Sequence, residues 1–104
     1  MLTEITFRHF EAVPELRDHV RKAIEKLNRF YDGITTAHVV LDIAHVEKKQ
    51  KTVEISLGVY RQTLTASGMA ETHEEAVNLC VAHLRRQVLR YKDKLRSVDK
   101  DVHR

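Results

Sequence analysis

Apolar residues recur at helical intervals in the C-terminal third of the chain, over residues 72–95. Steps of three and four residues place these side chains along one side of an α-helix. Thr72 and Glu75 have the spacing of a capping box, so the helix is predicted to begin at Thr72. The predicted buried stripe consists of Val77, Cys80, Val81, Leu84, Val88, Tyr91 and Leu95.

A second helix is predicted over residues 14–30, ending near Phe30 or Tyr31. Pro14 suits its first turn, because the N–H group that proline lacks needs no partner there. Asp32-Gly33 then predicts the end of the helix and a turn of the chain. The predicted buried stripe consists of Leu16, Val20, Ile24, Leu27 and Tyr31.

Four segments alternate between apolar and polar residues, a pattern that predicts β-strands over residues 2–8, 36–46, 52–60 and 63–69. The charged segment EKKQK at 47–51 and the short Arg61-Gln62 step predict the turns between the last three strands, which we expect to form an antiparallel meander. The order β-α-β-β-β-α predicts an α+β fold, in which a four-stranded sheet carries two helices packed side by side on one face. The alternation leaves the other face exposed to water.

Length and composition fit one globular domain, predicted over residues 1–96, followed by a short polar C-terminal tail at 97–104 that we expect to fray. Hydrophobic residues make up 42% and charged residues 32% of the 104 positions, which excludes a disordered chain. No apolar run approaches transmembrane length, and the N-terminus is no signal peptide, so we expect a cytoplasmic protein without a membrane partner. A single cysteine, Cys80, excludes an internal disulfide and is predicted to be a core residue.

Cations cluster on the predicted helices, although the formal net charge is only +3. At about 100° per residue, Arg86, Arg90 and Lys94 follow His83 along one flank of the last helix, opposite Arg85 and Lys92. Because the two helices are expected to be neighbours, their basic rows would border one groove. Clustered lysine and arginine are typical of phosphate binding. The candidate RNA-binding residues are Lys22, Lys26, Arg29, His83, Arg86, Arg90, Lys92 and Lys94.

An alternative interpretation is a solvated charged helix face, in which Asp18, Glu25 and Asp93 pair with some of the cations. Tyr60 is the sole aromatic candidate for base stacking on the open sheet face, so single-strand binding there is disfavoured. Recognition of the backbone and shape of structured RNA fits the basic rows better.

Catalytic and metal-binding signatures are absent from the sequence, so we expect no enzyme activity, no cofactor, no metal and no small-molecule substrate. No histidine pair has i, i+4 spacing on a helix, and no second cysteine is present. Glu74 and Glu75 complement the helix dipole rather than form an acid pair. The seven scattered histidines are His9, His19, His38, His45, His73, His83 and His103.

Three segments resemble the short ribosome hibernation-promoting factors, also called ribosome-associated inhibitor or sigma-54 modulation proteins. They are PELRDHVRKAIEKLNRFYDGI, AHVVLDIAHV and LTASGMAETHEEAVNLCVAHLRRQVLRYKDKL. The most telling pieces are Lys26-Leu27 followed by an aromatic pair and Asp32, and the closing LRRQVLRYKDKL. The resemblance covers nearly the whole chain and implies the same β-α-β-β-β-α fold.

The resemblance also implies binding to small-subunit rRNA in the channel between head and body, where messenger and transfer RNA would sit. Such a factor blocks translation and preserves idle ribosomes, and some members promote ribosome dimers. His83 stands where the family usually has lysine. Family basic positions fall on Lys26, Arg86, Arg90, Lys92 and Lys94.

Two other function classes stay open at this point. The chain could be a protein-interaction module that acts as a transcription-linked regulator through its open sheet face, or a small enzyme that uses its histidines. For the ribosome-binding hypothesis, we expect the free protein to be a monomer. The sequence leaves open whether ribosomes would be silenced singly or in pairs.

Overall fold

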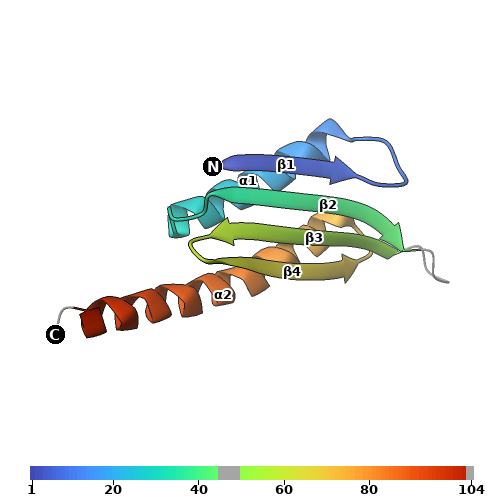
Figure 1. The fold of residues 1–104 in the computed structure, drawn as a ribbon. Coiled ribbons are helices and arrows are strands. Elements are labelled where there is room, and N and C mark those ends of the chain that lie inside the picture. Colours follow the sequence, from blue (N-terminus) through green and yellow to red (C-terminus); the bar gives the residue numbers. More distant parts are fainter. Residues whose placement is uncertain (45–49, 103–104) are drawn as a thin grey trace.

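The computed structural model describes residues 1–44 and 50–102 and confirms the predicted α+β fold (Figure 1). One four-stranded sheet carries both helices on the same face, so the order β-α-β-β-β-α holds. The elements are β1 (Leu2–Phe7), α1 (Pro14–Phe30), β2 (Thr36–Ala44), β3 (Gln50–Val59), β4 (Gln62–Ala70) and α2 (His73–Val102).

The strand order across the sheet is β1-β2-β3-β4. β1 and β2 are parallel, from the pair Leu2 and Thr36 to the pair Phe7 and Leu41. α1 is the crossover between these two parallel strands. β2, β3 and β4 are antiparallel neighbours, which confirms the predicted meander. α2 packs on β3 and β4 and lies beside α1.

The strand boundaries differ from the prediction at two places, and the first is the start of β3, which includes Gln50 and Lys51 of the predicted turn. Residues 45–49, which hold most of the predicted 47–51 turn and the end of the strand predicted to residue 46, lie outside the described residues. The next turn is Tyr60-Arg61, one residue earlier than predicted, because Val59 pairs with Gln62. Arg61 has a φ of 66°, which lets this two-residue turn reverse the chain.

α2 runs past the predicted end at Leu95 as far as Val102. Residues 97–102 contain neither glycine nor proline, so no helix-ending residue follows Leu95. Residues 97–102 of the segment predicted as a fraying tail therefore continue the helix, and residues 103–104 lie outside the described residues. At 1.5 Å per residue, α2 is about 45 Å long, and its C-terminal end extends beyond the sheet (Figure 1).

The N-terminus of α2 is capped as the sequence predicted. The Oγ1 atom of Thr72 accepts a hydrogen bond from the N–H of Glu75 at 3.2 Å. The Thr72 carbonyl accepts the first helical hydrogen bond, from the N–H of Ala76 at 3.2 Å. Glu74 and Glu75 lie in the first turn, where their charges complement the helix dipole. The cap therefore sets the residue at which α2 begins.

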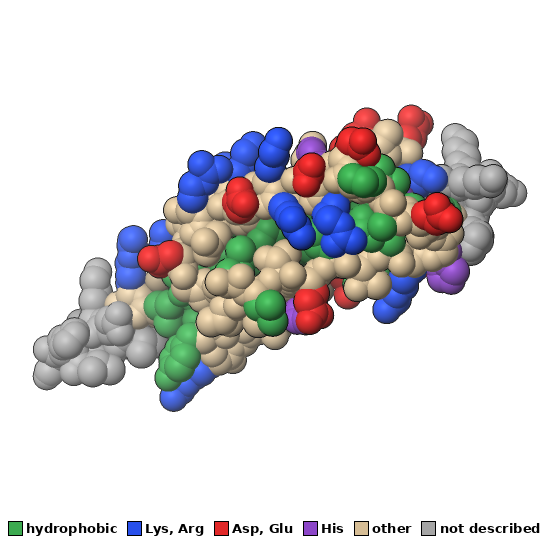
Figure 2. Space-filling model, turned by 90° about the horizontal axis from the view of Figure 1, so that it is seen from above, with side chains coloured by type: hydrophobic (Ala, Val, Ile, Leu, Met, Phe, Trp, Pro, Cys, Tyr) green, Lys and Arg blue, Asp and Glu red, His purple; other side chains and the backbone are tan. Residues whose placement is uncertain are grey.

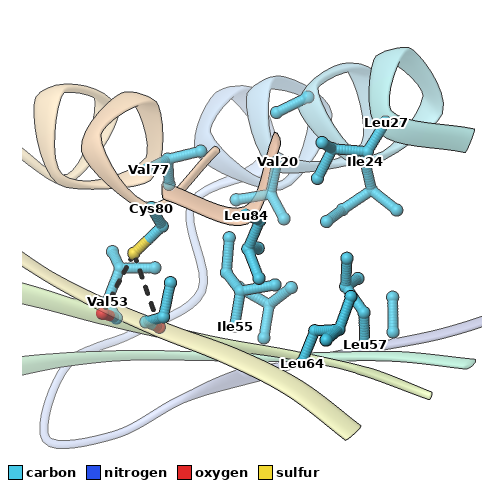
Figure 3. Packing of buried hydrophobic residues seen from close by; sticks show 14 of the residues in the cluster. Val20, Ile24, Leu27, Val53, Ile55, Leu57, Leu64, Val77, Cys80 and Leu84 are labelled. Atoms are coloured by element: carbon cyan, nitrogen blue, oxygen red, sulfur yellow. Dashed lines mark hydrogen bonds between the residues drawn. The ribbon is translucent and has the colours of Figure 1, made fainter. Parts of the chain in front are cut away.

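The core lies between the sheet and the two helices (Figure 3). The apolar stripes predicted for the two helices face this core, and the inward side chains of β2, β3 and β4 pack against them from the sheet. The largest fully buried side chains include Val20, Ile24 and Leu27 of α1, Val77, Leu84 and Val88 of α2, and Val39, Leu41, Val53, Ile55 and Leu57 of the sheet.

Cys80 is part of this core, as predicted. Its thiol donates to the carbonyl of Val53 at 3.4 Å and lies 3.8 Å from the carbonyl of Ala66 (Figure 3). Burial, with a smaller contribution from the charge of Glu54, raises the pKa of the Cys80 thiol to about 11. The thiol is therefore protonated at neutral pH and is no nucleophile.

Gly68 of β4 allows α2 to lie close to the sheet. A Cβ atom at this position would lie 2.6 Å from the carbonyl oxygen of Ala76 and 3.2 Å from the sulfur of Cys80. The first of these contacts is with helix backbone, which cannot rotate away as a side chain can. The missing Cβ therefore sets the distance between α2 and β4.

We expect Gly68→Ala to lower the free energy of unfolding by about 1–3 kcal/mol, because the added methyl group overpacks the contact between α2 and β4. Urea unfolding followed by circular dichroism measures this change. Ser67→Ala, at an exposed position in the same strand, is the matched control and should unfold like the wild type. Equal stability of both variants would show that α2 does not depend on the close approach.

Asp42 ties the loop after β1 to the start of α2. Its Oδ1 atom accepts hydrogen bonds from Nδ1 of His9 at 2.8 Å and from the N–H of Ile43 at 2.7 Å. Its carbonyl accepts one from Nε2 of His73 at 2.9 Å, and the His73 ring stacks on Phe10 with centroids 4.7 Å apart. The hydrogen bond from His9, followed by that from Ile43, lowers the pKa of Asp42 below its ordinary value of 3.8.

The lowered pKa of Asp42 predicts a pH-dependent contribution to stability. The ionised carboxylate stabilises the folded state above pH 3.8, and this stabilisation is lost as the pH falls through the lower folded-state pKa. We therefore expect Asp42→Asn to lower the melting temperature at pH 7, with a difference from wild type that shrinks below pH 3.8. The control is Asp18→Asn at an exposed position of α1. A difference for Asp42→Asn that is constant with pH would contradict this role.

Candidate nucleic-acid interface

A groove of about 660 Å³ runs between α1 and α2 on the outer side of the helix layer. Its floor is apolar and includes Ala23, Val81 and Leu89. His19 and Asn78 connect the two helices across it, since Nε2 of His19 donates to Oδ1 of Asn78 at 3.3 Å. We call this the inter-helix groove, and the cations that line it are Lys22, Lys26 and Arg29 of α1 and Arg85 and Arg86 of α2.

Basic and acidic side chains are interspersed over the face of the molecule that is seen from above (Figure 2). Glu25 is the acidic residue among those that line the inter-helix groove. Within residues 1–44 and 50–96, the contacts at ion-pair distance, closer than 4.0 Å, are His9 with Asp42 and His38 with Glu4, and each is an ion pair only when the histidine is protonated. Within these residues, the groove cations therefore have no carboxylate partner at ion-pair distance. Asp18 and Glu25 therefore do not pair with these cations, and a solvated charged helix face stays an alternative.

Phe30, the last residue of α1, contacts the groove cation Arg85 and one further cation, Lys92, at the end of the groove. The guanidinium carbon of Arg85 lies 5.0 Å from the centroid of the Phe30 ring, and Nζ of Lys92 lies 5.2 Å from it. A second hollow of about 320 Å³ adjoins the groove here, and we call it the Phe30 hollow. It is lined by Lys26, Leu27, Arg29, Phe30, Val81 and Arg85.

The structure divides the predicted site residues between two surfaces. Lys22, Lys26, Arg29 and Arg86 line the inter-helix groove, and Lys92 lies over Phe30 at its end. Arg90 and Lys94 instead line a depression beside β4, together with Gln62 and Gln87. His83 is exposed on the same flank of α2 by helical spacing. We call His83, Arg90 and Lys94 the α2 flank.

The expectation that the whole row from His83 to Lys94 borders the groove is therefore wrong. Of that row, the structure places only Arg86 in the groove. The flank of α2 that faces α1 carries Arg85 and Lys92, which sequence reasoning had placed on the opposite side. Gln87 shows which flank of α2 faces β4, because its Nε2 atom donates to the carbonyl of Thr65 in β4 at 2.9 Å.

Arg85 is the groove residue that the candidate list missed. Helical spacing places it on a flank but does not say which flank faces α1. The right-handedness of β-α-β crossovers could have supplied this information. Once β1, α1 and β2 form a right-handed unit, the sheet face that carries the helices is fixed, and the side of α2 that meets α1 follows.

The histidines and the cysteine do not converge in the described part of the chain. Among residues 1–44 and 50–96, no three side chains of histidine, cysteine, aspartate or glutamate are placed to hold a metal ion. The absence of a metal or cofactor stays a prediction. No helix in the described residues combines the length and the apolar character needed to cross a bilayer.

The sequence matches a family model described as "Sigma 54 modulation protein / S30EA ribosomal protein" over residues 3–96. A relative from Klebsiella oxytoca, named ribosome hibernation promoting factor, is 31% identical over 97 residues, which are 93% of this chain and 99% of the relative. A factor of the same name from Azotobacter vinelandii is 30% identical, over 90% of this chain and 85% of the relative.

Longer relatives also match. The ribosome hibernation promotion factor of Bacillus subtilis is 29% identical over 84% of this chain, and the match spans 46% of that relative's length. The chain thus corresponds to about half of this longer protein.

Two solved structures share the fold. A ribosomal subunit interface protein from Coxiella burnetii has a TM-score of 0.80 at 22% identity and covers 89% of this chain and 99% of its own. The N-terminal domain of Protein Y from Thermus thermophilus has a TM-score of 0.77 at 27% identity, over 88% of this chain and 99% of its own. With the family model matched over nearly the whole sequence, the chain belongs to the sigma 54 modulation protein / S30EA ribosomal protein family.

Proposed function

We propose that this protein is a ribosome hibernation factor that binds small-subunit rRNA and holds idle ribosomes inactive. The observation that carries the proposal is the inter-helix groove, whose five cations have no carboxylate at ion-pair distance within the described residues. Relatives that match nearly the whole chain and are named ribosome hibernation promoting factors support it. The role is one of binding in the bacterial cytoplasm and requires no cofactor or catalysis.

The groove suits the phosphate backbone of structured RNA. Arginine guanidinium groups, such as those of Arg85 and Arg86, donate two parallel hydrogen bonds to one phosphate, whereas Lys22 and Lys26 act as point charges. Phosphate contacts position a protein on RNA without reading its sequence. A groove of this kind therefore favours a binding site defined by the shape of folded rRNA.

The site on the ribosome that we propose is the channel between the head and body of the small subunit. A protein seated there excludes messenger and transfer RNA, which blocks translation. The α2 flank would contact a second RNA segment, because His83, Arg90 and Lys94 face away from the inter-helix groove. The free protein is proposed to be a monomer that meets RNA with both surfaces.

The first test is co-sedimentation with purified bacterial ribosomes through a sucrose gradient. We expect comigration with the small subunit or the whole ribosome at low salt and release at high salt, because phosphate contacts displace counterions. A ribosome-dimer peak in the same run would show pairing of ribosomes. Absence from the ribosomal fractions at low salt would reject the proposal, and salt-insensitive capture of protein without RNA would favour a protein-interaction module.

The second test separates the two basic surfaces by charge reversal. We expect Lys26→Glu with Arg86→Glu to weaken ribosome binding at low salt by at least about 100-fold, since each lost charge-assisted contact is worth about 1.5–3 kcal/mol and two are lost. Arg90→Glu with Lys94→Glu tests the α2 flank in the same way. The matched control is Arg17→Glu with Arg21→Glu, which changes the net charge equally on the other flank of α1. Equal losses in all three pairs would show that binding depends on net charge and not on the groove.

A further inference from the structure

We propose that the Phe30 hollow is an anchor site for a single phosphate group of the RNA, and that Phe30 is the residue that positions its cations. The inference rests on the proposed function and adds to it a named contact point. It concerns Arg85, Lys92 and Phe30, which meet where α1 ends and which periodicity alone did not bring together.

Two cations share one aromatic ring at this point. The guanidinium carbon of Arg85 and Nζ of Lys92 lie 5.0 and 5.2 Å from the Phe30 centroid, so both fall within the range of cation–π attraction. Their mutual separation cannot exceed the sum of these distances, which is about one Debye length at 0.1 M salt. The two like charges therefore repel each other while the ring attracts both.

The side chains that line the Phe30 hollow add positive charge, and none of them is acidic. Lys26 and Arg29 of α1 line the same hollow, and its remaining walls are apolar, formed by Leu27, Val81 and the Phe30 ring. Glu25 lines the inter-helix groove but not this hollow. None of these four cations has a carboxylate at ion-pair distance among residues 1–44 and 50–96. A phosphate group placed in the hollow would relieve repulsion among Lys26, Arg29 and Arg85, which line it. Lys92 does not line the hollow and adds its charge from its contact with the Phe30 ring.

Phe30 restricts the conformations of the Arg85 and Lys92 side chains as well as attracting their charges. Its half-buried ring is fixed at the C-terminus of α1, whereas Arg85 and Lys92 project from α2 two turns apart. The ring holds these long side chains on the α1 side of α2, so less rotamer freedom is lost when a phosphate binds. The guanidinium of Arg85 can then present its planar donor pair to two phosphate oxygens.

The molecule contains a matched pair for comparison. The guanidinium carbon of Arg17 lies 5.3 Å from the centroid of Phe7, on the other flank of α1. This second arginine–phenylalanine contact has nearly the same distance but lies outside the inter-helix groove. Phe7→Leu and Arg17→Gln are therefore controls for Phe30→Leu and Arg85→Gln.

The experiment is a titration of the ¹⁵N-labelled protein with inorganic tripolyphosphate, which presents linked phosphate groups without any base or ribosome. We expect resonances of Phe30, Arg85 and Lys92 to shift first. Phe30→Leu should weaken tripolyphosphate binding about 5- to 10-fold while circular dichroism stays that of the wild type. Phe30→Tyr, which keeps the ring, should bind like the wild type, and Phe7→Leu should leave binding unchanged.

The same variants are then compared on ribosomes over a series of salt concentrations. Loss of one phosphate contact should reduce the slope of log affinity against log salt by about 0.7–0.9 in Phe30→Leu and Arg85→Gln. Arg85→Gln lies at an exposed position, so it tests the hollow even if Phe30→Leu fails to fold. Equal tripolyphosphate affinity of Arg85→Gln and Arg17→Gln, or shifts confined to the α2 flank, would overturn the anchor site. Tripolyphosphate binding in the hollow without any ribosome binding would reject the proposed function alone.

Discussion

The apolar stripe of α2, pressed against β3 and β4, fixes the rotation of this helix about its axis, and the positions of its cations follow from that rotation. Val77, Leu84 and Val88 are fully buried, and Gly68 lets the helix backbone lie close to β4. Because the helix has 3.6 residues per turn, burying one stripe of side chains fixes the direction in which every other side chain of the helix points. Arg85 is therefore directed toward α1, and Arg90 toward the edge of the sheet.

Carboxylate pairing differs between the two sides of the described molecule, and this difference is the basis for proposing an anionic partner. On the sheet side, Glu4 pairs with His38 and Asp42 with His9. On the helix side, the described lysines and arginines of the groove have no such partners. Surface ion pairs contribute at most about 1 kcal/mol each, so their absence costs the fold little. The same absence leaves the full charge of each cation available to a phosphate.

Features set by neighbouring residues could be predicted from the sequence. The Thr72 cap, the stripes of both helices and the inward positions Leu64 and Ala66 depend on spacing along the chain, and the structure confirms them. The end of α2 was predicted too early, because polar composition after Leu95 is compatible with helix as long as glycine and proline are absent. The hydrogen bonds of Asp42 to His9 and His73 join residues more than thirty positions apart, and the spacing of residues along the chain does not predict such contacts.

The candidate site also shows that residue spacing does not predict contacts between distant parts of the chain. Periodicity placed rows of cations on both helices but assigned the wrong flank of α2 to the groove. The contact of Phe30 with Arg85 and Lys92 combines the end of one helix with the middle of another. Such a contact exists only when α1 and α2 are docked, so the packed core and the proposed phosphate-binding surface depend on the same arrangement. A substitution that shifts either helix would disturb the groove even if every cation were kept, because phosphate recognition requires the charges to converge.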